Sequence, residues 1–154
     1  PLAAEKFKID NFALYFTFFS GSTILLRIFF GKLFDRFSRK FFIFTGIIFI
    51  AAGLLLISEF NLLYLLWGAL IYGVGYGIND SNLLPYILKL LKNTPVETSV
   101  AAYSISFDSG YLFGPIILGL AAERAGFSFL FKLMTAGIVI LGILFLLINR
   151  EEEF

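Results

Sequence analysis

The sequence predicts an all-α membrane protein with five transmembrane helices. Of its 154 residues, 59% are hydrophobic and only 15% are charged, whereas soluble domains have about 45–50% apolar and about 25% charged residues. The apolar residues gather in five long stretches between short charged segments. Each stretch approaches the roughly 20 residues that a helix needs to cross a bilayer. The stretches are continuous and too long for the alternating strands of a membrane barrel.

Charge clusters set the bounds of the expected spans. One such stretch could be a buried core helix, but five in succession joined by short loops leave little room for that alternative. The third stretch is long and has polar residues near its end, and the fourth contains one acid and a proline. We expect spans at 12–30, 41–58, 62–88, 98–121 and 127–148, an extracytoplasmic loop at 1–11 and a cytoplasmic tail at 149–154.

Basic residues predict the orientation of these spans. Seven of them follow the first, third and fifth spans, and three lie on the opposite side. Because lysine and arginine favour cytoplasmic loops, the fragment is expected to have its N-terminus outside and its C-terminus in the cytoplasm, within the cell membrane. No signal peptide precedes the first span, so we expect at least one helix upstream and read the chain as a piece of a longer protein.

Composition also limits the chemistry. The chain has no Cys and no His, which removes disulfides, thiolate metal sites and the commonest metal ligand. No G-x-x-x-x-G-K-[ST] motif for ATP occurs. A net charge of +1 gives no electrostatic footprint for nucleic acid. We therefore expect no enzyme, no cofactor, no metal and no nucleic-acid partner.

The loop after the first span carries a dense charge pattern, GKLFDRFSRK at residues 31–40. Gly31 permits close helix approach and a tight turn. Asp35 can accept charge-assisted hydrogen bonds from Arg36 or Arg39. Such a cluster could join two helix ends in one conformation and release them in another. The alternative is a set of ordinary positive-inside anchors.

The order of these residues resembles the G-x-L-x-D-R-x-G-R-K/R loop of the major facilitator superfamily. In that family of transporters the loop joins the second and third helices, and a weaker copy joins the eighth and ninth. Ser38 stands where the family usually has glycine, which puts the turn geometry in doubt. The resemblance implies that the matching residues close the cytoplasmic side in one conformational state: Gly31, Leu33, Asp35, Arg36, Arg39 and Lys40.

The fourth span carries a second resemblance, to the G-x-x-x-G-P pattern of the family's fifth helix in antiporters and of its counterpart, the eleventh. The alternative, a small-residue packing seam with a proline kink, is compatible with it. Both imply close packing and bending at Gly110, Gly114, Pro115 and Gly119.

Two further features concern which half of the family's bundle the chain represents. The family's fourth helix usually has an arginine, which the third span lacks, and the chain ends one helix after the Gly-Pro span. Both favour the C-terminal half, helices eight to twelve, as a partial bundle. The mirror assignment to helices two to six stays open because the two halves are related repeats.

Asp108 is the first candidate for a substrate or proton contact. An acid inside a membrane is costly and usually faces the bundle interior or water. Ser104 and Tyr111 share its helix face, four residues before and three after. The alternative role is a hydrogen bond to a neighbouring helix.

Asp80 is the second candidate. It lies in an Asn-Asp-Ser-Asn run that suggests either an interrupted helix lining a cavity or a frayed helix end. Arg27 either snorkels to the interface or pairs with one of the two acids. The glycines just before Asp80 favour close packing or bending, and the tyrosines between them share a face that suits a pathway: Gly73, Gly77, Tyr72 and Tyr76.

Together these features imply a fragment of a secondary active transporter that works by alternating access with a missing N-terminal half. We expect a small-molecule substrate, coupling to protons and a lipid bilayer as surroundings, with uptake and efflux both open. The alternative is a membrane assembly subunit without a transport cycle. That alternative predicts fixed partners for the buried acids and no cavity.

Overall fold

The computed structural model describes residues 13–34 and 38–148, without the side chains of residues 32–34. It has five α-helices and, within these ranges, no strand: α2 (Ala13–Phe34), α3 (Arg39–Ile57), α4 (Leu62–Leu90), α5 (Val96–Ala125) and α6 (Phe127–Ile148). All five are long and apolar enough to cross a membrane. The predicted all-α fold with five transmembrane helices is confirmed. The predicted loop at 1–11 and tail at 149–154 lie outside the described residues.

The ends of the helices follow local chemistry. The side chain of Asn61 accepts a hydrogen bond from the backbone N–H of Leu63, at 2.9 Å, and so caps the start of α4. Gly126 ends α5 with φ of 86°, a conformation that glycine adopts readily. Pro85 and Pro115 lie inside helices that continue past them. The Asn-Asp-Ser-Asn run is therefore neither a break nor a frayed end, because α4 stays helical to Leu90.

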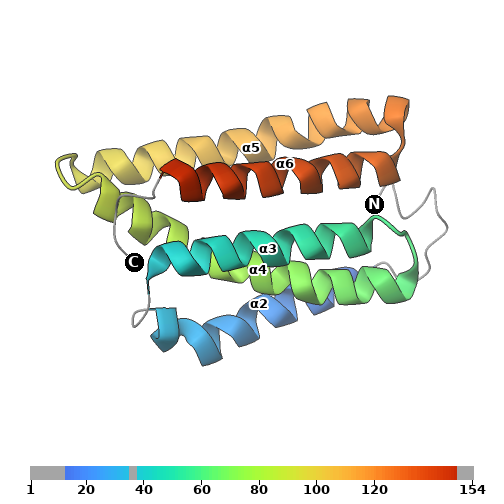
Figure 1. Ribbon diagram of the computed structural model, residues 1–154, viewed down its shortest axis with the longest axis horizontal. Helices are drawn as coiled ribbons and strands as arrows, with labels where there is room; N and C mark the ends of the chain where they lie inside the picture. Colours follow the sequence, from blue (N-terminus) through green and yellow to red (C-terminus); the bar gives the residue numbers. More distant parts are fainter. Residues whose placement is uncertain (1–12, 35–37, 149–154) are drawn as a thin grey trace.

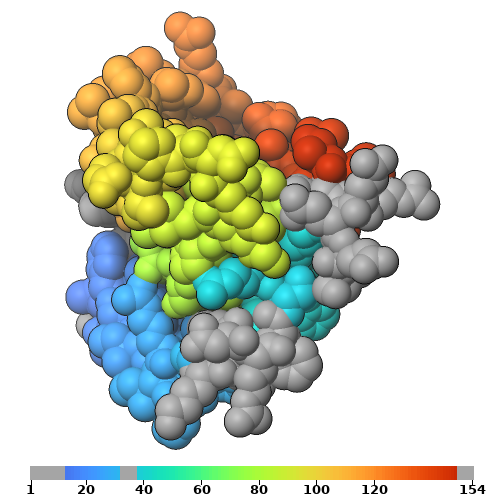
Figure 2. All heavy atoms as spheres, turned by 90° about the vertical axis from the view of Figure 1, so that its left-hand side faces the viewer, coloured from blue at the N-terminus to red at the C-terminus, as the bar shows by residue number. Residues whose placement is uncertain are grey.

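The helices lie roughly side by side in layers (Figure 1). α3 and α4 form the most extensive contact, α2 packs on α4, and α6 packs on α3. α5 lies beside α6 and meets α4 only along a small area. An end-on view places α5 and α2 at opposite edges, with α4 between them (Figure 2). One side of α4 therefore lies between α2 and α5.

Glycines bring α3 and α4 together. A Cβ at Gly75 would lie 2.6 Å from the backbone N of Ile50 and 2.7 Å from the carbonyl O of Gly46. A Cβ at Gly68 would lie 3.0 Å from the carbonyl O of Gly53. In each helix the two glycines are seven residues apart, so they lie on one face. We call this contact the glycine seam: Gly46 and Gly53 of α3 with Gly68 and Gly75 of α4.

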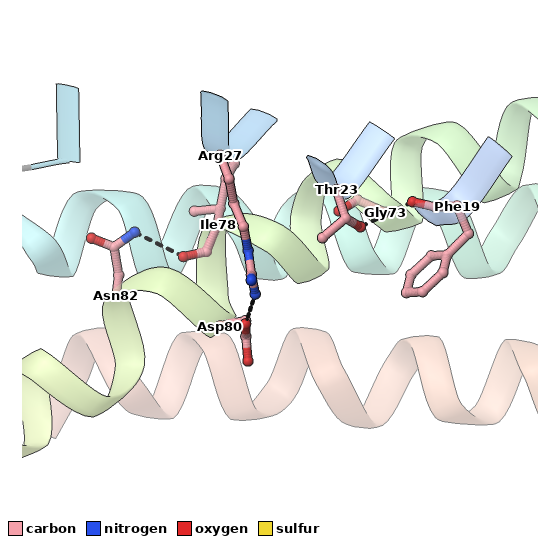
Figure 3. Close-up of polar contacts among 7 residues, drawn as sticks. All are labelled: Phe19, Thr23, Arg27, Gly73, Ile78, Asp80 and Asn82. Atoms are coloured by element: carbon pink, nitrogen blue, oxygen red, sulfur yellow. Dashed lines mark hydrogen bonds and ion pairs between the residues drawn. The ribbon is translucent and has the colours of Figure 1, made fainter. Parts of the chain in front are cut away.

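α2 packs on another face of α4. A Cβ at Gly73 would lie 2.7 Å from the carbonyl O of Phe19, and one at Gly77 would touch Leu26 at 3.2 Å. The hydroxyl of Thr23 lies within hydrogen-bonding distance of two carbonyl oxygens, that of Phe19 at 2.9 Å and that of Gly73 at 3.1 Å (Figure 3). Small residues and a hydroxyl bond are typical of helix contacts in lipid.

α6 is tied to the turn between α3 and α4. The ring of Phe60, whose φ is 48°, meets the rings of Phe127 and Phe131 edge-on, with centroids 6.4 and 5.7 Å apart. Lys132 Nζ lies 3.7 Å from Glu59 Oε1. Lys132 therefore has an acidic partner at this end of the bundle.

Candidate functional site

An open groove runs between α4 and α5. Its larger part encloses about 600 Å³, within the range of about 300–1,000 Å³ that ligand pockets span. Four of its lining residues carry hydroxyl groups, namely Ser106 and three tyrosines. The lining residues are Tyr72, Tyr76, Ser106, Phe107, Gly110, Tyr111, Gly114, Pro115 and Leu118.

A second part of the groove, of about 460 Å³, continues toward the loop between α4 and α5. It shares Ser106 and Phe107 with the first part, so the two are continuous along α5. Its remaining lining is mostly apolar and comes from the C-terminal part of α4 and the N-terminal part of α5: Leu83, Ile87, Leu91, Ser99, Ala102 and Tyr103.

Aromatic rings line both sides of the groove. On α5 the ring of Phe107 lies between those of Tyr103 and Tyr111, with centroids 6.0 and 5.1 Å apart. On α4 the rings of Tyr72 and Tyr76 pack against Phe19 of α2, at 5.8 and 5.5 Å. Tyr111 of α5 lines the same part of the groove as these two α4 tyrosines. The groove is therefore bounded by aromatic faces and phenol groups from two helices.

An ion pair crosses from α2 to α4 beside this groove. Arg27 Nη2 donates a hydrogen bond to Asp80 Oδ2 (Figure 3). The sequence left Arg27 with two alternatives, and the structure places it in a pair with Asp80. The Arg27 side chain is 51% exposed and that of Asp80 28%. Asp80 lies on α4 four residues after Tyr76 and three before Leu83, which line different parts of the groove.

Asp108 lies on α5 with its side chain exposed. Within the part of the chain that the structure describes, it makes no hydrogen bond and no ion pair. Ser104 is exposed on the same helix, and Tyr111 is 64% exposed. Of these three, Tyr111 lines the groove, and Asp108 flanks it because it lies one turn away. A Cβ at Gly110, Gly114 or Gly119 would meet no atom within 4 Å.

The motif at residues 31–40 lies at the junction of α2 and α3. Gly31 is inside the last turns of α2, with open space where a Cβ would be. Arg39 begins α3, and Lys40 is buried in its first turn, with 8% of its surface exposed. The Leu33 side chain, Asp35 and Arg36 lie outside the described residues.

Two buried amide oxygens lie on α4 near the ion pair. Asn82 is 1% exposed, and its Nδ2 donates to the carbonyl O of Ile78 at 2.8 Å (Figure 3). The Oδ1 atoms of Asn82 and Asn79 have no hydrogen-bond partner among the described atoms. The Asn79 Oδ1 lies 2.6 Å from the position that a Cβ at Gly46 would occupy. Both oxygens are buried, and that of Asn79 lies at the contact with Gly46 of α3.

Sequence reasoning missed several groove residues. It did not single out Tyr103, Ser106 or Phe107, although Tyr103, Phe107 and Tyr111 follow one another at a four-residue interval that places them on one helix face. It also missed the seven-residue spacing within the glycine seam. In residues 13–34 and 38–148 no group of three acidic side chains could hold a metal ion.

Comparison with known proteins adds one finding. The family model described as Major Facilitator Superfamily matches residues 1–153. No curated protein and no solved structure matches the chain significantly. The family match spans all five helices and the groove.

Proposed function

The chain belongs to the major facilitator superfamily, and from this premise we propose that it forms part of a secondary active transporter for a small molecule. It is an integral membrane protein, and the family indicates transport. In the proposed mechanism two halves rock about a site near the middle of the membrane. These five helices supply one half, and a further set of helices supplies the other.

The observation that carries this proposal is the open groove between α4 and α5, with Asp108 at its edge, an acid that has no hydrogen bond or ion pair among the described residues. An assembly subunit without a transport cycle would have fixed partners for its acids and no cavity. The Arg27–Asp80 pair fits that alternative, but the groove and Asp108 do not. An acid on a membrane-spanning helix is expected to face water, a substrate or another polar group. We propose that Asp108 meets protons or substrate where the two halves join.

We further propose that the chain is the C-terminal half, helices eight to twelve, in the cell membrane with its N-terminus outside. The absence of an arginine in Leu62–Leu90 and the Gly-Pro pattern on the next helix support the half. The basic residues between α2 and α3 and after α4 support the orientation.

The roles of the motif residues follow from this placement. Gly31, Leu33, Asp35, Arg36, Arg39 and Lys40 would close the cytoplasmic side in one state. A Cβ at Gly110, Gly114 or Gly119 would meet no described atom of another helix. We propose that a helix of the other half packs at Gly119, that Gly110 and Gly114 keep the groove open, and that Pro115 allows α5 to bend. Gly73 and Gly77 hold α4 against α2.

Asp108→Asn in the full-length protein tests the proposal. We expect proton-driven flux into proteoliposomes to fall by about tenfold or more, since losing one charged contact has an effect of this size. Exchange of substrate without a proton gradient should persist, because asparagine keeps the shape of the side chain but cannot release a proton.

The control is Glu123→Gln, on the same helix but outside the groove lining. It should transport as the unchanged protein does. If Asp108→Asn keeps both its flux and its response to the proton gradient, Asp108 has no part in coupling.

A further inference from the structure

We propose that the Arg27–Asp80 pair is an exchangeable counter-ion site and that the groove selects lipophilic organic cations, which displace Arg27 from Asp80. This inference rests on the proposed function only in taking the groove between α4 and α5 as the substrate path. It adds the charge and the chemical class of the substrate.

The position of Asp80 is the first step. Tyr76 lines the larger part of the groove and Leu83 lines the smaller part. Asp80 lies between them along α4, four residues after Tyr76 and three before Leu83, so all three share one helix face. Asp80 therefore lies beside the junction of the two parts. A molecule that occupies the whole groove passes this carboxylate.

The weakness of the pair is the second step. Arg27 contacts Asp80 through one nitrogen and one oxygen, whereas a strong arginine–carboxylate pair uses two parallel bonds. The Arg27 side chain is half exposed, so its neighbours in the structure do not hold it fixed against Asp80. Arg27 can therefore leave Asp80 for another position at small cost when a second cation arrives.

The lining of the groove determines whether a positively or a negatively charged ligand is favoured. The faces of Tyr72, Tyr76, Phe107 and Tyr111 attract cations through their ring electrons. None of the residues that line either part is lysine or arginine. Arg27, the described cation that pairs with Asp80, is already neutralised by it. An anion would find no free positive charge in this lining, whereas an aromatic cation finds ring faces and an exchangeable carboxylate.

The experiment uses two probes of the same shape and opposite charge, tetraphenylphosphonium and tetraphenylborate. Equilibrium binding of each to purified full-length protein in detergent is compared between the unchanged protein and its variants, so that partition into micelles cancels. Asp80→Asn should weaken tetraphenylphosphonium binding about tenfold. Arg27→Gln should strengthen it several-fold, because it removes the competing cation. Asp80→Asn should strengthen tetraphenylborate binding, because it leaves the charge of Arg27 unbalanced, whereas Arg27→Gln should not strengthen it.

Glu59→Gln is the matched control, an exposed acid paired with Lys132 away from the groove. It should leave the binding of both probes unchanged. Arg27→Gln keeps Asp80 in place, so its expected gain tests the proposal even if Asp80→Asn fails to fold.

Equal weakening of tetraphenylphosphonium binding by Arg27→Gln and Asp80→Asn would make the pair purely structural and overturn the proposal. Tetraphenylborate binding to the unchanged protein that exceeds that of the cation, or that weakens in Asp80→Asn, would overturn it as well. Binding is measured without flux, so its outcome is separate from that of the Asp108→Asn assay. A protein that transports another solute with proton coupling but shows no preference for the cation contradicts this inference alone.

Discussion

Gly75→Ala is expected to force α3 and α4 apart and to lower the thermal stability of the protein sharply. The new methyl group would lie 2.6 Å from the backbone N of Ile50 and 2.7 Å from the carbonyl O of Gly46. Backbone atoms cannot rotate away as side chains do, so relief requires that the helices separate. Overpacking a core costs about 1–3 kcal/mol, and contact with backbone should place this variant at the upper end. The midpoint of thermal unfolding in detergent measures the effect.

Gly137→Ala is the matched control. Gly137 lies in α6, and a Cβ there would meet no atom within 4 Å. The same substitution in a helix of the same protein should leave the midpoint unchanged or raise it slightly, because alanine favours helix over glycine. Equal midpoints for the two variants would contradict the packing of the glycine seam.

Asp80→Arg is expected to remove most folded protein from the membrane, and adding Arg27→Asp to it is expected to recover a large part. The single change places two guanidinium groups against each other across α2 and α4. A charge inside a membrane helix is costly even before repulsion is added, at about 2.5–3.5 kcal/mol for the helix centre. The double reversal restores an opposite pair between the same two helices. The yield of monodisperse protein on size exclusion measures both effects.

The second described ion pair provides the comparison. Lys132 and Glu59 are each more than half exposed and 3.7 Å apart. Glu59→Lys should therefore change the yield little, since exposed pairs contribute about 0–1 kcal/mol. If the double reversal of Arg27 and Asp80 gives no more folded protein than Asp80→Arg alone, the two residues do not interact.

The helices could be predicted from the sequence because each is a continuous apolar stretch that needs no knowledge of its neighbours. The partner of Arg27 could not, since choosing between the interface, Asp80 and Asp108 requires knowing that α2 lies beside α4. The glycine seam escaped prediction for the same reason. Two glycines seven residues apart form such a contact only when two antiparallel helices meet with their glycines at the same level.

The candidate site, too, could be predicted from the sequence only in part. Tyr72, Tyr76 and Tyr111 were singled out from their spacing on single helices, and the structure places all three around one groove. Their place on two helices that flank a groove could not be foreseen, because it depends on how α5 lies against α4. The roles of Asp108 and of the motif at 31–40 remain predictions.

The most direct test of the central claim, that the α4–α5 groove is a water-filled substrate path, is cysteine accessibility along α5. The chain has no cysteine of its own, so single cysteines can be introduced once any others in the full-length protein are replaced. Ser106→Cys and Gly114→Cys line the groove. Ile105→Cys and Ile116→Cys lie on the opposite face of the same helix.

A membrane-impermeant thiol reagent applied to the full-length protein in vesicles is expected to modify the two groove positions and to leave the two isoleucine positions unmodified. Saturating substrate should protect the groove positions. Equal modification of all four positions, or modification confined to Ile105→Cys and Ile116→Cys, would contradict a path between α4 and α5.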